Sequence, residues 1–125
     1  MYKLVARIDI EGAHKLDLDY ESPCQNLHGH RWNIEVTLAG KELNQNGMLC
    51  DFKIVKDILN KNVHDILDHQ NLNDVFCFNP TAENISTWVA DQMNYGLINA
   101  NVAGVRCVKV SVFETAKNNA IWEED

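Results

Sequence analysis

Regular alternation of apolar and polar residues is the feature that most restricts the fold of this chain. From Trp32 to Leu38 every second residue is apolar and the residues between them are polar, and the run ends at Gly40. Successive side chains of a strand point to opposite faces, so this pattern predicts a strand with one buried face. The segment from Tyr2 to Ile10 alternates in nearly the same way. We therefore expect two half-buried strands in the first third of the chain.

Two segments with helical periodicity follow these strands. Asp51 is placed to cap the first helix, because its carboxylate can accept hydrogen bonds from free backbone N–H groups. The expected apolar stripe of this helix comprises Phe52, Val55, Ile58, Leu59, Val63 and Ile66. Pro80 and Thr81 open the second helix, since proline is tolerated in a first turn and threonine is a good cap. Its expected buried face comprises Ile85, Trp88, Val89, Met93 and Leu97.

Two further strands are predicted near the end of the chain. Residues 108–112 alternate between valine and polar side chains, and residues 119–122 can pair with them across a turn at 116–118. The order strand, strand, helix, helix, strand, strand predicts an α+β fold, with a four-stranded antiparallel sheet and both helices on one face. A chain of 125 residues that is 46% apolar favours a single domain, 1–125. Pairing of the sheet edges between subunits would protect them, which favours an oligomer.

The charge and the cysteines narrow the class of protein. The net charge of −7 argues against binding to nucleic acid or to an anionic membrane surface. The four cysteines form no C-x-x-C pair and do not have the pattern of a secreted disulfide framework. No apolar run is long enough for a membrane span, and the first residues lack an apolar signal core. The expected compartment is the cytoplasm.

Histidines are the strongest candidates for chemistry. His28 and His30 start the second strand and therefore point to one side, which provides two imidazole ligands for a metal. His14, in an expected polar loop from Glu11 to Cys24, would complete a three-histidine zinc site with one open position. The pattern alone does not link His14 to the pair. Cys24 is a fourth metal ligand, a nucleophile or base beside the metal, or a small buried residue.

Three acidic positions complete the candidate set. Asp68 precedes His69, and a carboxylate can orient a histidine and hold its protonated form, unless the pair is only a polar helix end. Glu114 closes the third strand, where a carboxylate can accept two N–H bonds from an amidine-like heterocycle or can simply be solvated. Thr81 and Glu83 stand at a helix start, where a capping role is the simplest explanation.

Taken together, these segments resemble the 6-pyruvoyl-tetrahydropterin synthase / 6-carboxytetrahydropterin synthase family. Six motifs occur in the order of that family and span nearly the whole chain. They are Ala13-His14, Cys24-x-x-x-His28-Gly29-His30, Gly47-Met48-x-x-Asp51-Phe52, Leu67-Asp68-His69-x-x-Leu72-Asn73, Asn79-Pro80-Thr81-x-Glu83-Asn84 and Glu114-Thr115. The resemblance implies a tunnelling fold, in which trimers close their sheets into a barrel and pair into homohexamers, with active sites between subunits.

The resemblance also implies a role for each candidate residue. His14, His28 and His30 would hold Zn²⁺. Cys24 would be the catalytic thiolate, with Asp68 and His69 as a second acid/base unit. Glu114 would anchor the pterin ring, helped by Thr81 and Glu83. Candidates for binding the triphosphate are Lys15, Arg31, Lys53 and Lys117.

The implied activity is that of a zinc-dependent carbon–oxygen lyase. Only three residues separate Cys24 from His28, which looks like the bacterial 6-carboxy-5,6,7,8-tetrahydropterin synthases of queuosine biosynthesis. That branch converts 7,8-dihydroneopterin triphosphate to 6-carboxy-5,6,7,8-tetrahydropterin, releasing triphosphate and acetaldehyde. Formation of 6-pyruvoyl-tetrahydropterin, or a related cleavage of the pterin side chain, is one alternative. A non-catalytic zinc- or pterin-binding module, with Cys24 as a fourth zinc ligand, is another.

Overall fold

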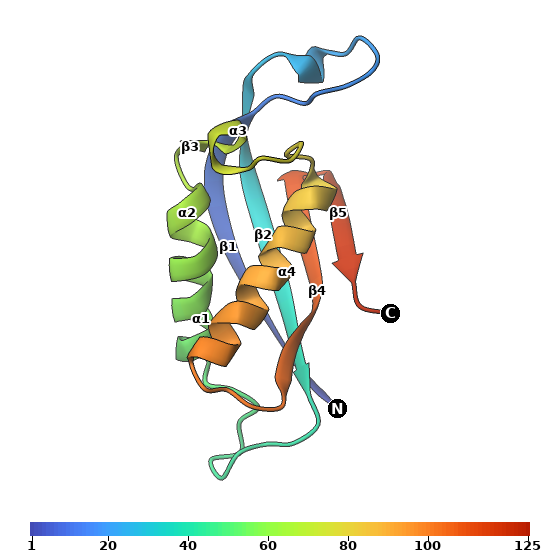
Figure 1. Cartoon of the computed structure of the whole chain (residues 1–125). Helices are drawn as coiled ribbons and strands as arrows, with labels where there is room; N and C mark the ends of the chain where they lie inside the picture. Colours follow the sequence, from blue (N-terminus) through green and yellow to red (C-terminus); the bar gives the residue numbers. More distant parts are fainter.

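A computed structural model describes all 125 residues, and its centre is one twisted sheet (Figure 1). The long strands are β1 (Tyr2–His14), β2 (His28–Gly40), β4 (Val105–Thr115) and β5 (Asn118–Glu123). They are antiparallel to their neighbours in the order β1-β2-β4-β5. The predicted α+β fold with a four-stranded antiparallel sheet is thus confirmed. A fifth, two-residue strand that we did not predict, β3 (Gln70–Asn71), pairs parallel to the end of β1.

The expected start of the polar loop at Glu11 is wrong. β1 continues to His14, because residues 11–14 pair with residues 28–31 of β2. Alternation within the segment could not show this, since the pairing depends on a strand that is distant in sequence. His14 therefore ends a strand and lies directly opposite His28.

All helices cover one face of the sheet (Figure 1). The first helical segment runs through α1 (Phe52–Leu59), a π-helical turn (Asn60–His64) and α2 (Asp65–Leu67). A short helix, α3 (Leu72–Val75), follows β3, and α4 (Ala82–Asn99) crosses the sheet. Asp51 and Thr81 are the N-caps of α1 and α4, accepting from the N–H groups of Lys53 and Asn84. None of these helices combines the length and the apolarity that a membrane crossing needs.

The predicted stripe of the first helix is partly wrong. Phe52 is 59% exposed and Ile66 is 38% exposed, whereas Leu67 is fully buried. Phe52 is the first residue of α1. For Ile66, the reason is the π-helical turn, which contains one residue more than an α-helical turn. The buried stripe consequently steps from Leu59 to Val63 and then to Leu67, which leaves Ile66 in solvent.

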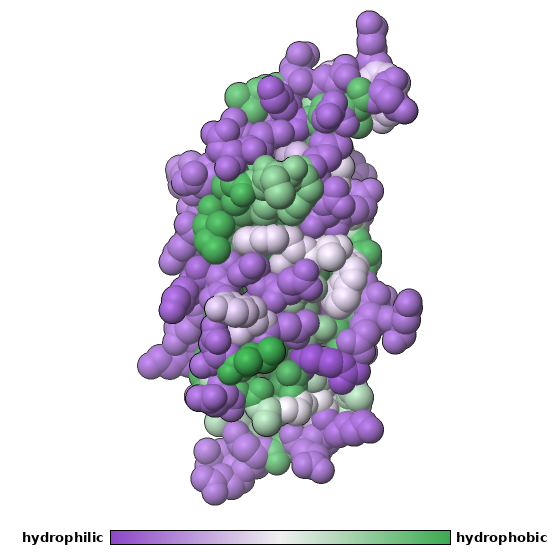
Figure 2. Space-filling model, viewed as in Figure 1, coloured by the Kyte–Doolittle hydropathy of each residue, from purple (hydrophilic) through white to green (hydrophobic).

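The core lies between the sheet and the helices. Twenty-two buried residues form one cluster, including Ile34 and Val36 of β2 and Val89 and Met93 of α4. On the outer side of the helices hydrophilic residues predominate and hydrophobic ones form separate patches (Figure 2). The core-facing side of β2 begins at its N-terminal end with His28 and His30 and continues with Trp32. The candidate ligands are therefore an extension of the core face to the end of the sheet.

Candidate metal centre and active site

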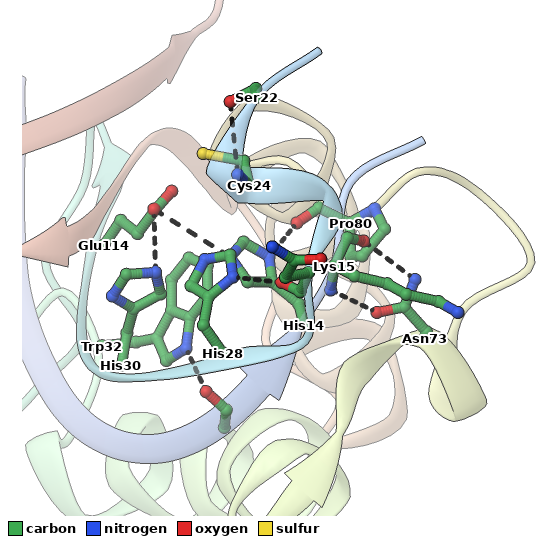
Figure 3. A network of polar contacts seen from close by, with 12 residues as sticks. His14, Lys15, Ser22, Cys24, His28, His30, Trp32, Asn73, Pro80 and Glu114 are labelled. Atoms are coloured by element: carbon green, nitrogen blue, oxygen red, sulfur yellow. Dashed lines mark hydrogen bonds and ion pairs between the residues drawn. The ribbon is translucent and has the colours of Figure 1, made fainter. Parts of the chain in front are cut away.

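The paired ends of β1 and β2 bring three histidines together (Figure 3). His14 lies opposite His28 in the strand register, and His30 is two residues further along the same face. The ring centroids are 4.6 Å apart for His14 and His28, 4.7 Å for His28 and His30, and 5.2 Å for His14 and His30. The three rings thus converge at the end of the sheet that also holds β3.

Backbone carbonyl groups orient two of these rings. Nδ1 of His14 donates to the carbonyl oxygen of Pro80 at 2.8 Å, and Nδ1 of His28 donates to that of Asn26 at 2.7 Å. When Nδ1 carries the proton in a neutral imidazole, Nε2 keeps its lone pair. Both rings therefore present Nε2 as a ligand atom, and the bonds from Nδ1 to the carbonyl groups fix the orientation of the rings.

Burial favours the neutral form of His14 and His30. His14 is 0% exposed, and burial lowers its pKa below the usual value of 6.5 against the opposing effect of the bond to Pro80. Burial likewise lowers the pKa of His30. Trp32 packs edge-on against both rings, and its indole N–H donates to the carbonyl oxygen of Gly12 at 3.1 Å. Neutral imidazole is the metal-binding form, so the setting favours coordination.

Glu114 joins the three histidines as a fourth potential ligand. One ligand atom of each of the four residues lies within 4.8 Å of the others. Nε2 of His14 and Nε2 of His30 are buried without a hydrogen-bond partner, as expected of atoms that face a metal ion. Three imidazoles and a carboxylate are ligands that zinc accepts, so the residues fit the expected ion.

The position of Glu114 beside the histidines was missed by the sequence reasoning, although a signal existed. Val110 and Val112 of β4 face the core, and continued alternation directs Glu114 to the same face. Because β4 pairs with β2 next to Trp32, that face is the face of the histidines. Joining the two strand patterns would have placed the carboxylate near the imidazoles.

Cys24 lies on the loop above this cluster (Figure 3). The residue sits in a single 3-10 turn, Pro23–Gln25, between β1 and β2, and its N–H donates to the hydroxyl of Ser22 at 3.2 Å. Its carbonyl oxygen accepts from the N–H of Leu16 at 2.8 Å, which ties the two sides of the loop together. Cys24 is half-buried and reduced, and its sulfur is not among the four clustered ligand atoms.

Asp68 and His69 form a hydrogen-bonded pair. Nδ1 of His69 lies 2.8 Å from Oδ2 of Asp68, and the other carboxylate oxygen accepts from the N–H of Glu11 at 2.9 Å. The backbone of His69 is left-handed, with φ of 59°, which turns the ring back toward the carboxylate. The contact raises the pKa of His69, whereas the bonds from Glu11 and His69 lower the pKa of Asp68.

Asp68 lies at the β1 edge of the sheet, and the ring of His69 extends from there to the face opposite the metal cluster. Nε2 of His69 is 3.9 Å from the carboxylate of Glu11, whose neighbour Gly12 is paired with His30. Neighbouring residues of a strand point to opposite faces, so Glu11 and His69 share the face that no helix covers. They line an open hollow of about 540 Å³ together with Arg31, and His30 of the metal cluster lines it too. No hydrogen bond or ion pair within the chain joins the pair to the histidine cluster.

The three expected substrate-binding residues are only partly together. Glu83 and Glu114 line a second hollow of about 240 Å³, between the start of α4 and the β4–β5 turn. Thr81 does not line it, and its hydroxyl caps α4 by accepting from the N–H of Asn84 at 3.1 Å. The metal cluster therefore borders a hollow that carries two carboxylates.

Comparison with known proteins identifies the family. The family model described as 6-pyruvoyl tetrahydropterin synthase matches residues 3–125. The chain belongs to the 6-pyruvoyl tetrahydropterin synthase family. A 6-carboxy-5,6,7,8-tetrahydropterin synthase from Synechocystis is 32% identical, over 88% of this chain and 85% of that protein. The relative from Rickettsia bellii, with the same name, is 36% identical over 55% of this chain, a match that spans about half (49%) of its own length.

Solved structures of the 6-pyruvoyl tetrahydropterin synthase family have the same fold. The enzyme of that name from Caenorhabditis elegans superposes with a TM-score of 0.81, at 24% identity, and covers 99% of this chain and 96% of its own. At that identity the likeness supports the fold alone. It agrees with the strand and helix order predicted from the sequence.

Proposed function

We propose that this protein is a zinc-dependent carbon–oxygen lyase. Its substrate is 7,8-dihydroneopterin triphosphate, and its product is 6-carboxy-5,6,7,8-tetrahydropterin, a precursor in queuosine biosynthesis. The observation that carries the proposal is the convergence of His14, His28 and His30, with two buried Nε2 atoms lacking partners. Membership of the 6-pyruvoyl tetrahydropterin synthase family supports the pterin substrate, and the names of the relatives favour the carboxy product.

The three histidines would hold the ion, which when bound supplies Lewis-acid polarisation of the oxygens on the pterin side chain. Glu114 and Glu83 border the hollow beside the cluster, which suits a pterin because its amino-pyrimidine edge donates N–H bonds to carboxylates. In this proposal Glu114 holds the pterin ring in the hollow between the start of α4 and the β4–β5 turn. The side chain of the substrate then points toward the histidines.

Cys24 and His69 would carry the protons. Cys24, on the loop above the cluster, is the base on one side of the substrate side chain. His69, held by Asp68, is the acid/base group on the other side. Because the ring of His69 extends to the helix-free face and no bond joins the pair to the cluster, we propose that a second copy of the chain supplies this pair. That arrangement requires an oligomer, a trimer or a dimer of trimers, with sites between subunits.

For the triphosphate we favour Arg31 over Lys53. Arg31 lines the same open hollow as His69. Lys53, by contrast, is in the first turn of α1, at the other end of the helical segment that leads to Asp68. Fourteen residues, 54–67, lie between Lys53 and Asp68 and set them about 20 Å apart along the helical segment.

Product identification tests the proposal. Purified protein loaded with zinc would be incubated with 7,8-dihydroneopterin triphosphate, and the product mass determined. A 6-carboxy product with release of acetaldehyde is expected. A pyruvoyl product, or a hydroxymethyl pterin, would instead support one of the alternative reactions in the family. Absence of turnover with metal bound would support a binding module, although the position of Glu114 rather than Cys24 beside the histidines speaks against a cysteine-closed site.

A further inference from the structure

The turn that carries Cys24 is tied to the segment that directly follows β1. The N–H of Leu16 donates to the carbonyl oxygen of Cys24 at 2.8 Å, and the side-chain amide of Gln25 donates to the carbonyl oxygen of Leu18 at 3.1 Å. The two partners on the segment, Leu16 and Leu18, flank Asp17 in the sequence. The position of the turn above the histidines therefore depends on what holds this segment in place.

Two asparagine side chains hold the segment. The side-chain oxygen of Asn73 accepts the N–H of Lys15 at 2.9 Å, and its amide group donates to the carbonyl oxygen of Lys15 at 3.0 Å (Figure 3). Asn79 makes the same pair of bonds with Asp17, at 2.9 Å and 3.0 Å. In an extended segment successive backbone groups point to opposite sides, so the N–H of Leu16, between the two, points the other way. These four bonds are the asparagine clamp.

The clamp continues the edge of the sheet where β3 stops. β3 pairs parallel to β1, with Ala13 opposite Asn71, and Asn71 is its last residue. Two residues further along both segments, Asn73 bonds Lys15 with its side chain instead of its backbone. A side-chain amide carries the same donor and acceptor as a peptide group, so it can replace a strand neighbour. Ionised aspartate has the same shape but only acceptors, so it cannot make both bonds.

Resting on the function proposed above, we propose that Asn73 and Asn79 are positioning residues for the thiol of Cys24. They fix the segment that bonds the turn, and so they determine where the sulfur stands above the histidines. Neither asparagine lines the hollow that Glu83 and Glu114 share, so neither touches the proposed place of the pterin ring. Their effect on the reaction passes through Cys24.

The first test separates turnover from binding. Asn79→Asp keeps the shape of the side chain but places an oxygen against the carbonyl oxygen of Asp17. Asn99→Asp, which adds the same charge at the exposed end of α4, is the matched control. We expect kcat of Asn79→Asp, counted per zinc-loaded site, to fall at least about tenfold, because the support of the turn is weakened. KM and zinc affinity should stay unchanged, and the control should match wild type in all three.

Asn73→Asp provides a second variant and should show the same pattern, since it breaks the other half of the clamp. Unchanged kcat in both variants would overturn the inference. So would a loss of kcat that is accompanied by an equal loss of zinc or substrate affinity, because the asparagines would then support the whole site and not the thiol.

The second test observes the loop without turnover. Backbone hydrogen exchange is followed by mass spectrometry in zinc-loaded wild type and in Asn79→Ala, which removes both bonds and adds no charge. Peptides covering residues 15–27 should exchange at least about tenfold faster in the variant, and peptides of β4 should be unchanged. Equally slow exchange of residues 15–27 in both proteins contradicts the clamp.

The two tests separate this inference from the proposed function. Wild-type protein that does not turn over 7,8-dihydroneopterin triphosphate defeats the proposed function, and with it the catalytic purpose of the clamp. An active wild-type enzyme whose asparagine variants keep both kcat and slow exchange defeats this inference alone.

Discussion

Asp68 and its neighbour His69 bond to both backbone groups of Glu11. The carboxylate of Asp68 accepts the N–H of Glu11 at 2.9 Å, and the carbonyl oxygen of Glu11 accepts the N–H of His69 at 2.6 Å. The end of α2 is thereby fastened to β1, and the histidine that follows is held in its left-handed conformation. Because the same carboxylate also bonds the ring of His69, the strand holds both members of the pair in position.

The first prediction concerns the pKa of His69. Asp68→Asn removes the negative charge that stabilises the imidazolium, so the pKa of His69 should fall toward the ordinary value of 6.5. Measurement is by NMR titration of the ring proton resonances. Asp65→Asn is the control, because Asp65 contacts His64 and not His69. A pKa of His69 that is unchanged in Asp68→Asn would show that the hydrogen bond is not formed in solution.

The same pair makes stability depend on pH in a defined window. The raised pKa of His69 contributes stability below about 6.5 that is lost as the pH rises through the raised value. The lowered pKa of Asp68 contributes stability above about 3.8 that is lost as the pH falls through the lowered value. Asp68→Asn should therefore destabilise the protein more at pH 5 than at pH 9, as measured by urea unfolding. An equal effect at both values argues against the ion pair.

Zinc binding should stabilise the folded chain. At a free concentration of one hundred times Kd the gain is about 2.7 kcal/mol, which corresponds to a rise in Tm of roughly 10 °C for a chain of this length. His28→Ala should abolish the rise, because it removes one of the three imidazole ligands. His28 is chosen because it is less buried than His14, so its replacement disturbs the core less. His64→Ala, a histidine outside the cluster, should keep it. A rise in Tm that survives His28→Ala would place the zinc elsewhere.

Cys24→Ala should abolish turnover of 7,8-dihydroneopterin triphosphate while zinc remains bound. The sulfur is not among the clustered ligand atoms, so its loss removes a proton carrier and not a ligand. Metal content by elemental analysis and product formation by mass spectrometry report the two properties separately. Cys77→Ala, at an exposed cysteine, is the matched control and should retain activity. Full activity of Cys24→Ala would remove the thiolate from the mechanism.

Gly96→Ala tests the contact between the two helical segments. A methyl group at Gly96 of α4 would collide with Cγ2 of Ile58 in α1. Overpacking of this kind costs about 1–3 kcal/mol, more than the roughly 1 kcal/mol that alanine gains over glycine in a helix. We expect net destabilisation in urea unfolding. In the double variant Ile58→Ala/Gly96→Ala the effects should be less than additive, because the colliding atom is absent.

Local patterns predicted the elements of the fold, and pairing between distant strands determined the rest. Asp51 and Thr81 were identified as caps because a cap is a local feature, satisfied within three residues. The length of β1 was underestimated, because residues 11–14 become a strand only through their pairing with β2. β3 escaped prediction for the same reason, since its two residues have no periodicity of their own.

The candidate site was predicted as a set of residues but not as an arrangement. His28 and His30 could be assigned to one face from their spacing alone. The position of His14 opposite them needed the register of β1 and β2. The placement of Glu114 beside the imidazoles needed the pairing of β4 with β2 in addition. Each step depends on one more long-range contact than the last.

The π-helical turn at Asn60–His64 has a consequence for the way such a protein can diversify. A π-helical turn takes up one extra residue, so deleting one residue there would restore ordinary winding and leave Leu67 on the core face. Asp68 and His69 would then keep their bonds to β1. The chain can thus lose one residue at a place more than a full turn before Asp68 without redirecting the acid/base pair.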